Sequence, residues 1–354
     1  MTANASVEAE NLAALADSYS RGQAALTYPP ITVSIEATNR CNLRCPMCPV
    51  SQDYHAVSRG FMDLDLFREI VVQIMPFRPR ISMNIGGEST LHPQLPYMIN
   101  RLVQAGMSVC VDTNAATLKP EQMRDLIGSG LTEIVFCLDG ASAESYEAIR
   151  VRGRFDQTVA NIRAFLDLRR ALGSGTPHTV VKNIQRWRPD ADMATPAAYQ
   201  RLFGECPPDE YRATWMDHWP GDHRDRLVEP YQVEPFDEDG YQPCMNLWKN
   251  LPISWDGRVY VCCLDLKRTT PVGDVRTDGV LGVWNSPKLV EMRRRHAAGE
   301  QRDLALCRNC NQIRRTPDDP AAGLRAARED RFTPWARVAG PMTVESRAEG
   351  ESAG

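Results

Sequence analysis

Two groups of cysteines constrain this chain more than any other feature of its sequence. Cys41, Cys45 and Cys48 form the first group, a Cys-x3-Cys-x2-Cys run that is called the three-cysteine loop below. The second group lies near the other end and consists of Cys244, Cys262, Cys307 and Cys310. Four thiolates close a tetrahedral or cubane metal site, whereas three leave one ligand position open. The sequence therefore predicts one open and one closed metal site.

Zinc is the alternative occupant of both sites, because it accepts the same sulfur ligands. Near the first group no His stands at the spacing of a zinc ligand, and the nearest is His55. The second group leaves a four-cysteine zinc site open as an alternative. The chain has 11 cysteines and does not begin with the basic and apolar segments of a signal peptide, which favours reduced thiolates over disulfides.

Size and charge limit the classes of function. The 354 residues, 43% of them hydrophobic, suffice for one large α/β domain and a small appendage. The formal net charge of −4 offers no basic excess for binding nucleic acid. No run of about 18 apolar residues occurs. We therefore expect a cytoplasmic protein with neither a nucleic-acid nor a membrane partner.

Short β-branched runs alternate with segments of helical periodicity, as in parallel α/β proteins. The expected strands are residues 31–36, 80–85, 108–112, 133–138, 179–184 and 211–216. The expected helices are residues 63–75, 94–105, 120–129, 142–150 and 155–171. Six such βα units predict an open, partial (β/α)6 barrel rather than a closed eight-fold barrel.

The domain boundaries follow from changes in composition. Residues 1–29 form an N-terminal extension, and residues 30–219 form the barrel. Residues 220–243 are rich in Asp, Glu, Pro and Gly without periodicity, and we interpret them as a linker. Residues 244–312 contain too few apolar residues for a core of their own, so we expect a small metal-stabilised domain. The polar tail, residues 313–354, is expected to be partly disordered.

Four polar motifs directly follow four expected strands. They are the three-cysteine loop, Gly86-Gly87-Glu88, Asp112-Thr113-Asn114 and Asp139-Gly140. A parallel barrel opens its active face at the carboxyl ends of its strands. We therefore expect these motifs to meet in one site.

With this placement, the three-cysteine loop resembles the cluster loop of radical S-adenosylmethionine (SAM) enzymes. The resemblance implies that its three cysteines hold a [4Fe–4S] cluster whose fourth iron binds SAM. The spacing of the four C-terminal cysteines is similar to that of the auxiliary domains called SPASM and Twitch. It implies that Cys244, Cys262, Cys307 and Cys310 hold a second [4Fe–4S] cluster. Together the resemblances cover about residues 30 to 312.

The resemblance also implies a SAM-binding site. Gly86-Gly87-Glu88 resembles the family's GGE motif. In that motif the glycines let the backbone approach SAM closely, and the acidic residue helps to hold the ammonium group of SAM. Asn114 and Asp139 resemble the positions that meet the ribose and the carboxylate of SAM, and Arg150 is a candidate partner of that carboxylate. For each residue a turn, a cap or a solvated surface position remains an alternative.

The implied reaction is cleavage of SAM to a 5′-deoxyadenosyl radical, which abstracts hydrogen from a small polar substrate. A fully ligated auxiliary cluster suits electron transfer, which favours net two-electron oxidation of an aminocyclitol, a sugar or a nucleoside. An external one-electron reductant such as flavodoxin or ferredoxin would supply the electron for cleavage. Epimerisation, dehydration and decarboxylation of a similar substrate remain alternatives.

Two further classes of function remain open. Many relatives with auxiliary clusters modify ribosomally made peptides, often with a recruiting domain of about 80 residues. The 30 residues before the first expected strand are too few for such a domain. A non-catalytic, metal-stabilised assembly protein is the other class, and it predicts no cleavage of SAM.

Two local questions concern single residues. Trp215 lies near the end of the last expected strand, and Asp217, His218 and Trp219 follow it, which makes Asp217 and His218 the candidate catalytic residues. Asp256-Gly257 predicts a hairpin turn that returns the chain to Cys262. The neighbouring Cys263 points to the opposite face of a strand, so only one of the two thiols faces the site. The spacing favours Cys262.

Overall fold

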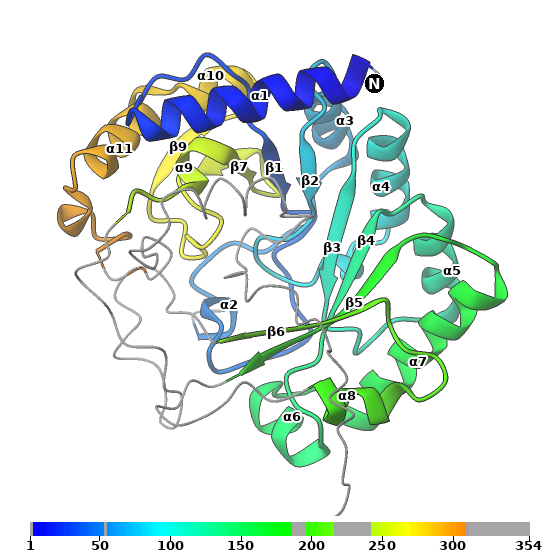
Figure 1. The fold of residues 1–354 in the computed structure, drawn as a ribbon. Coiled ribbons are helices and arrows are strands. Elements are labelled where there is room, and N and C mark those ends of the chain that lie inside the picture. The colour runs from blue at the N-terminus through cyan, green and yellow to red at the C-terminus, as the bar shows by residue number, and fades with distance from the viewer. Residues whose placement is uncertain (1–2, 53–54, 186–195, 216–241, 309, 311–354) are drawn as a thin grey trace, which may run out of the picture.

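A nine-stranded sheet forms the centre of the molecule in the computed structural model, which describes residues 3–52, 55–185, 196–215, 242–308 and 310 (Figure 1). The strand order is β6-β5-β4-β3-β2-β1-β7-β8-β9. The first six strands are β1 (Thr32–Ile35), β2 (Arg80–Ser82), β3 (Val109–Thr113), β4 (Glu133–Cys137), β5 (His178–Gln185) and β6 (Glu210–Trp215). Each pairs in parallel with the next, and all six expected strands are confirmed.

Helices cover the convex side of this sheet (Figure 1). The five expected helices are confirmed as α3 (Leu64–Ile74), α4 (Leu95–Gln104), α5 (Pro120–Gly128), α6 (Ala143–Ile149) and α7 (Phe155–Ala171). Two of them begin at capping side chains, Asp63 before α3 and Ser142 before α6, which satisfy free backbone N–H groups. The sequence analysis missed the short helices α2 (Pro49–Gln52) and α8 (Pro196–Phe203) and the 3-10 turn η1 (Ser89–Leu91).

Alternate residues of the strands face opposite sides of the sheet. Val111 and Phe136 join the main core between the sheet and its helices. Their neighbours Cys110, Val135 and Val180 form a separate small cluster on the concave side. That concave side is called the lumen below, and it bears charged side chains farther along the same strands.

The C-terminal region extends the sheet rather than forming a detached unit. Strand β7 (Asn250–Ile253) pairs in parallel with β1, and β8 (Arg258–Tyr260) and β9 (Pro271–Asp274) follow in antiparallel order. The predicted hairpin turn at Asp256-Gly257 is confirmed between β7 and β8, where Gly257 has φ +87°. The rest of this region consists of α9 (Asn246–Lys249), α10 (Gly279–Trp284), α11 (Pro287–Ala297) and the 3-10 turn η3 (Gln301–Asp303).

Helix α1 (Ala3–Ser20) lies against this C-terminal region, as Figure 1 shows. The rings of Tyr19 and Trp248 meet edge to face at 5.4 Å, and the Trp248 indole N–H donates to the Gln23 carbonyl at 2.7 Å. The Trp284 indole N–H donates to the Tyr28 carbonyl at 2.8 Å. The N-terminal extension and the C-terminal region therefore share one buried aromatic contact surface.

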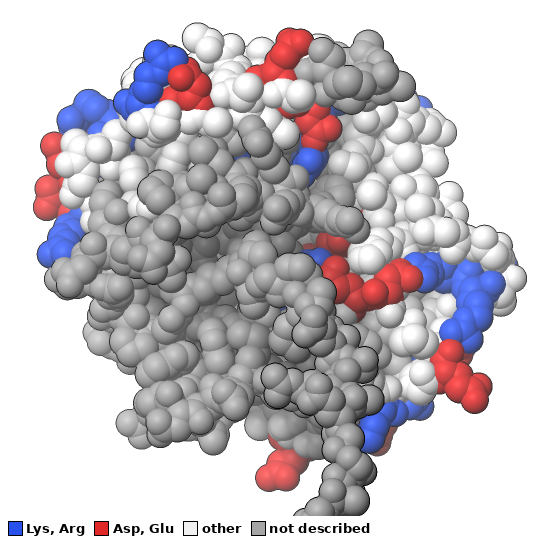
Figure 2. Space-filling view, in the orientation of Figure 1, with Lys and Arg blue, Asp and Glu red and all other residues white. Residues whose placement is uncertain are grey.

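Surface charges of both signs lie side by side. Figure 2 shows such neighbouring charges at the left edge of the molecule. On α11, Arg294 pairs with Glu291 and also with Glu300, which follows the helix. No helix in the described part of the chain combines the length and hydropathy needed to cross a lipid bilayer. Asp217, His218, the expected linker and the polar tail fall outside the described residues, apart from Gln242 and Pro243.

Candidate functional site

The three-cysteine loop packs over the carboxyl end of β5. Leu43, Cys45 and Met47 form a buried cluster with Ile149, and Ile184 of β5 packs against it. Inside the loop, the Cys48 N–H donates to the Cys45 carbonyl at 3.0 Å. Cys41 and Cys48 are half-buried on the same cluster. The loop thus presents three thiols within a largely apolar shell, an environment that limits the access of water to a metal.

Burial controls the ionisation of these thiols. It raises the pKa of Cys41 to about 12 and that of Cys48 to about 11. Burial also raises the pKa of Cys45, although the Arg150 guanidinium opposes the shift. Only the deprotonated thiolate binds iron, whereas burial favours the protonated thiol. The positive charge of the bound iron must therefore stabilise the thiolates. The soft donors and the dry shell fit an iron-sulfur cluster.

Glycine is required at the second position of Gly86-Gly87-Glu88. Gly87 has φ +89°, and a Cβ there would lie 2.6 Å from the carbonyl oxygens of Thr38 and Arg40. The Glu88 N–H donates to the Arg40 carbonyl at 2.8 Å. This tight turn places the motif against the segment that leads into Cys41.

The carboxylate of Glu88 is buried and ties β2 to the tip of β3. It accepts hydrogen bonds from the Thr113 hydroxyl at 2.7 Å and the Asn114 N–H at 2.8 Å. It also accepts from the N–H and the hydroxyl of Thr90. Burial raises the pKa of Glu88 against these four donors. Glu88 therefore serves the local structure whatever it contacts in SAM.

The other expected site residues surround the three-cysteine loop. The Asn114 side-chain amide donates to Asn42 Oδ1 at 2.9 Å. The Arg150 guanidinium lies 2.5 Å from the buried carboxylate of Asp139 and 3.8 Å from the Cys45 sulfur. The motifs that follow four successive strands thus meet at one edge of the sheet, as the sequence analysis predicts.

The C-terminal cysteines also gather. Electrostatic interactions with Cys244 and Cys262 contribute to the raised pKa of Cys307, whose main cause is burial. The Cys310 N–H donates to the Cys307 carbonyl at 3.0 Å. Hydrogen bonds to its sulfur, first from the Cys263 thiol and also from the Leu264 N–H at 3.3 Å, lower the pKa of Cys262. Cys262 is thus the better thiolate of the adjacent pair, because burial raises the pKa of Cys263 well above its usual range.

Among the described residues no three His, Cys, Asp or Glu side chains stand close enough to bind one metal ion. In a cubane each thiolate binds a different iron, so the ligands are spread farther apart than around a single ion.

Two family models match the chain. The model of the radical SAM superfamily matches residues 35–184, which include the three-cysteine loop. The model of SPASM, an iron-sulfur cluster-binding domain, matches residues 244–311, which include all four C-terminal cysteines. The chain is a radical SAM enzyme with a SPASM domain. Its cofactors are therefore SAM and two [4Fe–4S] clusters.

Curated radical SAM relatives match parts of the chain. The tungsten-containing aldehyde ferredoxin oxidoreductase cofactor-modifying protein of Pyrococcus furiosus is 32% identical over 30% of this chain. The AdoMet-dependent heme synthase of Methanosarcina barkeri is 28% identical over 39% of it. The matches span only 30% and 40% of these two relatives. Mycofactocin maturase MftC of Mycobacterium tuberculosis is 26% identical over 76% of this chain and 74% of its own.

Solved structures confirm the partial radical SAM barrel. BtrN in complex with AdoMet and 2-DOIA superposes with a TM-score of 0.51 at 15% identity, covering 79% of this chain and 92% of BtrN. The corresponding values for anSMEcpe with bound AdoMet are 0.54, 13%, 82% and 92%. For Streptococcus suis SuiB bound to precursor peptide SuiA they are 0.54, 12%, 84% and 73%. Such identities establish a shared fold alone.

The choice between the adjacent cysteines is testable in this radical SAM enzyme. We expect Cys262→Ala to lose or destabilise the auxiliary cluster, because one of its four expected thiolate ligands is removed. Cys263→Ala, the matched control, should retain the cluster. Iron and sulfide analysis after anaerobic reconstitution measures both. If only Cys263→Ala loses about half of the iron, the ligand assignment moves by one residue.

Two pairs of residues were missed by the sequence analysis. Lys182 of β5 lies 2.5 Å from the Asp112 carboxylate of β3, inside the lumen. Arg268, beyond Cys262, lies 2.6 Å from the buried carboxylate of Glu36, beyond β1. Their sequence signals were weak, because each is a charged residue in or beside an apolar run, and only the sheet topology brings the partners together.

Proposed function

We propose that this radical SAM enzyme oxidises a small polar substrate by two electrons within the barrel lumen. The substrate class is an aminocyclitol, a sugar or a nucleoside. The observation that carries the proposal is the Asp112–Lys182 ion pair, a charged donor and acceptor placed on the lumen side of the sheet below the three-cysteine loop.

The position of the pair follows from strand geometry. Lys182 and Ile184 point to the same side of β5, and Ile184 packs against the cluster of the three-cysteine loop. Two residues along a strand span about 6.6 Å, so Lys182 lies one side-chain layer below that loop. A substrate bound at Lys182 would therefore lie next to the site where SAM is cleaved.

The ion pair favours the charged form of Lys182. Burial disfavours the charge on Lys182, but its interactions with neighbouring groups, chiefly the Asp112 carboxylate, together outweigh burial and raise the pKa of Lys182. Asn84 fixes Asp112 by donating to its Oδ1 at 3.0 Å and accepting its N–H at 2.7 Å. The ammonium group has three protons and uses one for Asp112, so it can donate to a substrate hydroxyl.

The SAM site is assigned from the contacts around the three-cysteine loop. Cys41, Cys45 and Cys48 would hold the SAM-binding cluster, and the Gly86-Gly87-Glu88 turn would receive the methionine part of SAM. Asn114 would meet the ribose, while Arg150, held by Asp139, would pair with the SAM carboxylate. When bound, SAM supplies the 5′-deoxyadenosyl radical that takes a hydrogen atom from a carbon of the substrate.

The ion pair suits the next step. The remaining hydroxyl proton would pass to Asp112 Oδ2, and Lys182 Nζ would stabilise the negative charge left on the oxygen. The unpaired electron would leave to the auxiliary [4Fe–4S] cluster held by Cys244, Cys262, Cys307 and Cys310. The carbon–oxygen single bond thereby becomes a carbonyl, and the substrate loses two hydrogens in total. A reductant such as flavodoxin or ferredoxin would supply the one electron that SAM cleavage consumes, in a reducing compartment such as the cytoplasm.

The proposed role of the ion pair predicts that its loss impairs turnover of the substrate without affecting the cofactors. Lys182→Gln should lower kcat/KM for the substrate by about ten-fold or more, because one charge-assisted hydrogen bond is lost. The affinity for SAM and the iron content should not change. Assaying 5′-deoxyadenosine and product by mass across aminocyclitols, sugars and nucleosides tests this, with the exposed Lys288→Gln as the control. Equal kcat/KM in wild type and Lys182→Gln would contradict the assignment.

Peptide maturation is the second candidate function. It is favoured by the long match to mycofactocin maturase MftC, which covers 76% of this chain. The likeness in fold to SuiB, a protein solved with its precursor peptide, agrees with it. Under this alternative a peptide rather than a small molecule would stimulate SAM cleavage and change in mass.

A further inference from the structure

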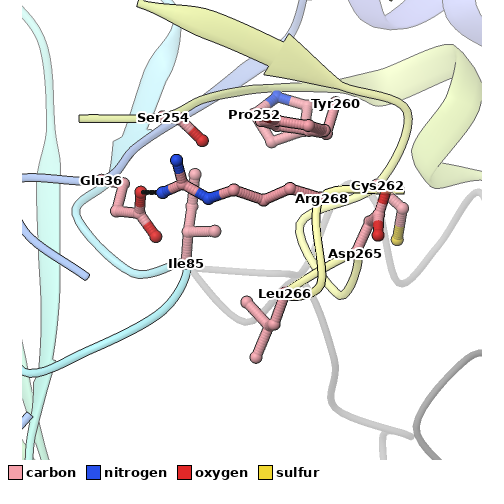
Figure 3. Close-up of a pocket in the computed structure, with 9 residues that line it drawn as sticks. All are labelled: Glu36, Ile85, Pro252, Ser254, Tyr260, Cys262, Asp265, Leu266 and Arg268. Carbon is pink, nitrogen blue, oxygen red and sulfur yellow. Dashed lines mark hydrogen bonds and ion pairs between the residues drawn. The ribbon is translucent and has the colours of Figure 1, made fainter. Parts of the chain in front are cut away.

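The carboxylate of Glu36 lies where the two cluster-binding regions of the chain meet. Glu36 follows β1 on the segment that leads to Cys41, and its relative exposure is 3%. Figure 3 shows it paired with Arg268 at the wall of a cavity of about 10 Å³ that Cys262 and Asp265 also line. This volume holds about one water molecule, so the charged groups are in close contact rather than in open solvent.

Three separate elements contact this one carboxylate. Its Oε1 accepts the N–H of Gly86 at 3.2 Å, in the turn assigned to SAM. Its Oε2 accepts the N–H of Trp255 at 3.2 Å, in the turn between β7 and β8. The same oxygen lies 2.6 Å from the Arg268 guanidinium, on the loop after Cys262. Glu36 therefore links the Gly86-Gly87-Glu88 turn, called the SAM turn below, directly to the C-terminal region that carries Cys262.

Arg268 is fixed on its own side of the link. Its guanidinium lies 5.6 Å from the centre of the Tyr260 ring and 6.0 Å from that of Trp255, and it also pairs with Asp256 at 3.3 Å. Its φ of +59° is uncommon for a side chain other than glycine, so neighbouring contacts must hold the backbone there.

The loop between Cys262 and Arg268 is also closed. The Asp265 N–H donates to the Cys262 carbonyl at 3.0 Å, and the Arg268 N–H donates to the Asp265 carbonyl at 2.9 Å. The Asp265 carboxylate accepts from the N–H groups of Thr269 and Thr270. A displacement of Arg268 is thereby transmitted to the cysteine that begins this loop.

We propose that Glu36 and Arg268 are positioning residues that couple SAM binding to the reduction potential of the auxiliary cluster. The proposal rests on the assignments of the SAM turn and of Cys262. It does not depend on the identity of the substrate. SAM that displaces Gly86 on binding also moves the Glu36 carboxylate. The ion pair with Arg268 transmits this movement to the loop that begins at Cys262. By linkage, the state of the auxiliary cluster then affects the affinity for SAM in return.

The signs of the expected changes follow from charge. Glu36→Gln removes a negative charge near the auxiliary cluster, so its midpoint potential should rise. Arg268→Gln removes a positive charge, so the potential should fall. The double variant removes both charges, and its potential should lie between those of the single variants. A merely structural role would give both single variants shifts of the same sign.

The test uses the reconstituted full chain with both clusters. Redox titration followed by electron paramagnetic resonance gives the auxiliary potential with and without SAM, and equilibrium binding gives the affinity for SAM. We expect SAM to shift the potential in wild type and to shift it little in Glu36→Gln, whose affinity for SAM falls by about two- to thirty-fold. Arg268→Lys keeps the charge and should restore most of the wild-type behaviour.

Glu133→Gln is the matched control, because Glu133 is equally buried and also faces an arginine, Arg212, but lies on β4. It should change neither the potential nor the affinity for SAM. Shifts of one sign in both single variants, or a SAM-induced shift that survives in Glu36→Gln, would overturn the proposal. If Glu36→Gln does not load iron, the sign of the shift in Arg268→Gln and its recovery in Arg268→Lys decide the question. Lack of product in any variant bears on the proposed oxidation and not on this coupling.

Discussion

Replacing Cys41, Cys45 and Cys48 together by alanine will abolish SAM cleavage and leave about half of the iron of the reconstituted protein. The three thiols form one loop on one apolar cluster, and no other cysteine among the described residues packs against that cluster. Removing them leaves the SAM-binding cluster without protein ligands, whereas the auxiliary cluster keeps its four cysteine ligands. Iron and sulfide analysis, together with chromatography of 5′-deoxyadenosine, measures the two effects.

A matched control uses a cysteine outside both groups. Cys110→Ala removes a fully buried thiol from the lumen side of β3 and should keep the full iron content. Wild-type protein that contains zinc but no sulfide after anaerobic purification would contradict the two-cluster assignment. SAM cleavage that persists in the triple variant would show that the open site lies elsewhere.

Replacing Cys307 and Cys310 together by alanine will abolish product formation while SAM cleavage partly remains. The substrate radical must lose one more electron after hydrogen abstraction, and the auxiliary cluster is the proposed acceptor. In wild type we expect 5′-deoxyadenosine and a product two hydrogens lighter in about equal amounts. Mass spectrometry of both compounds in one reaction measures this ratio.

The mass of the product distinguishes the alternative reactions. A product of unchanged mass indicates epimerisation, and a product lighter by water or carbon dioxide indicates dehydration or decarboxylation. Any of these would contradict the oxidation but not the radical SAM assignment. Equal product yield with and without the auxiliary cluster would show that the electron takes another route.

Strand-level features were predictable because they depend on local patterns. The β-branched runs fixed the six parallel strands, and the polar motifs that follow them identified the site edge, since strand ends meet there in any parallel barrel. Glu88, Asn114 and Arg150 lie around the three-cysteine loop for this reason.

Long-range contacts were not predictable from such patterns. The pairing of β7 with β1 joins residues more than 200 positions apart, and no periodicity specifies the partner of a strand. The Asp112–Lys182 and Glu36–Arg268 pairs depend on that topology in the same way. Helix α1 was missed because its apolar residues do not repeat on one helical face, and its stability depends on packing against the C-terminal region.

The pairing of β7 with β1 also constrains biosynthesis. Strand β1 leaves the ribosome early, but the chain that covers its second edge, Asn250–Ile253, is made only after the other barrel strands. Until then β1 carries a row of unpaired N–H and C=O groups, the kind of edge that recruits strands from other chains. A nascent or truncated chain that ends before β7 should therefore aggregate readily. Coexpression with a chaperone should raise the yield of intact protein more than it raises the iron content per chain.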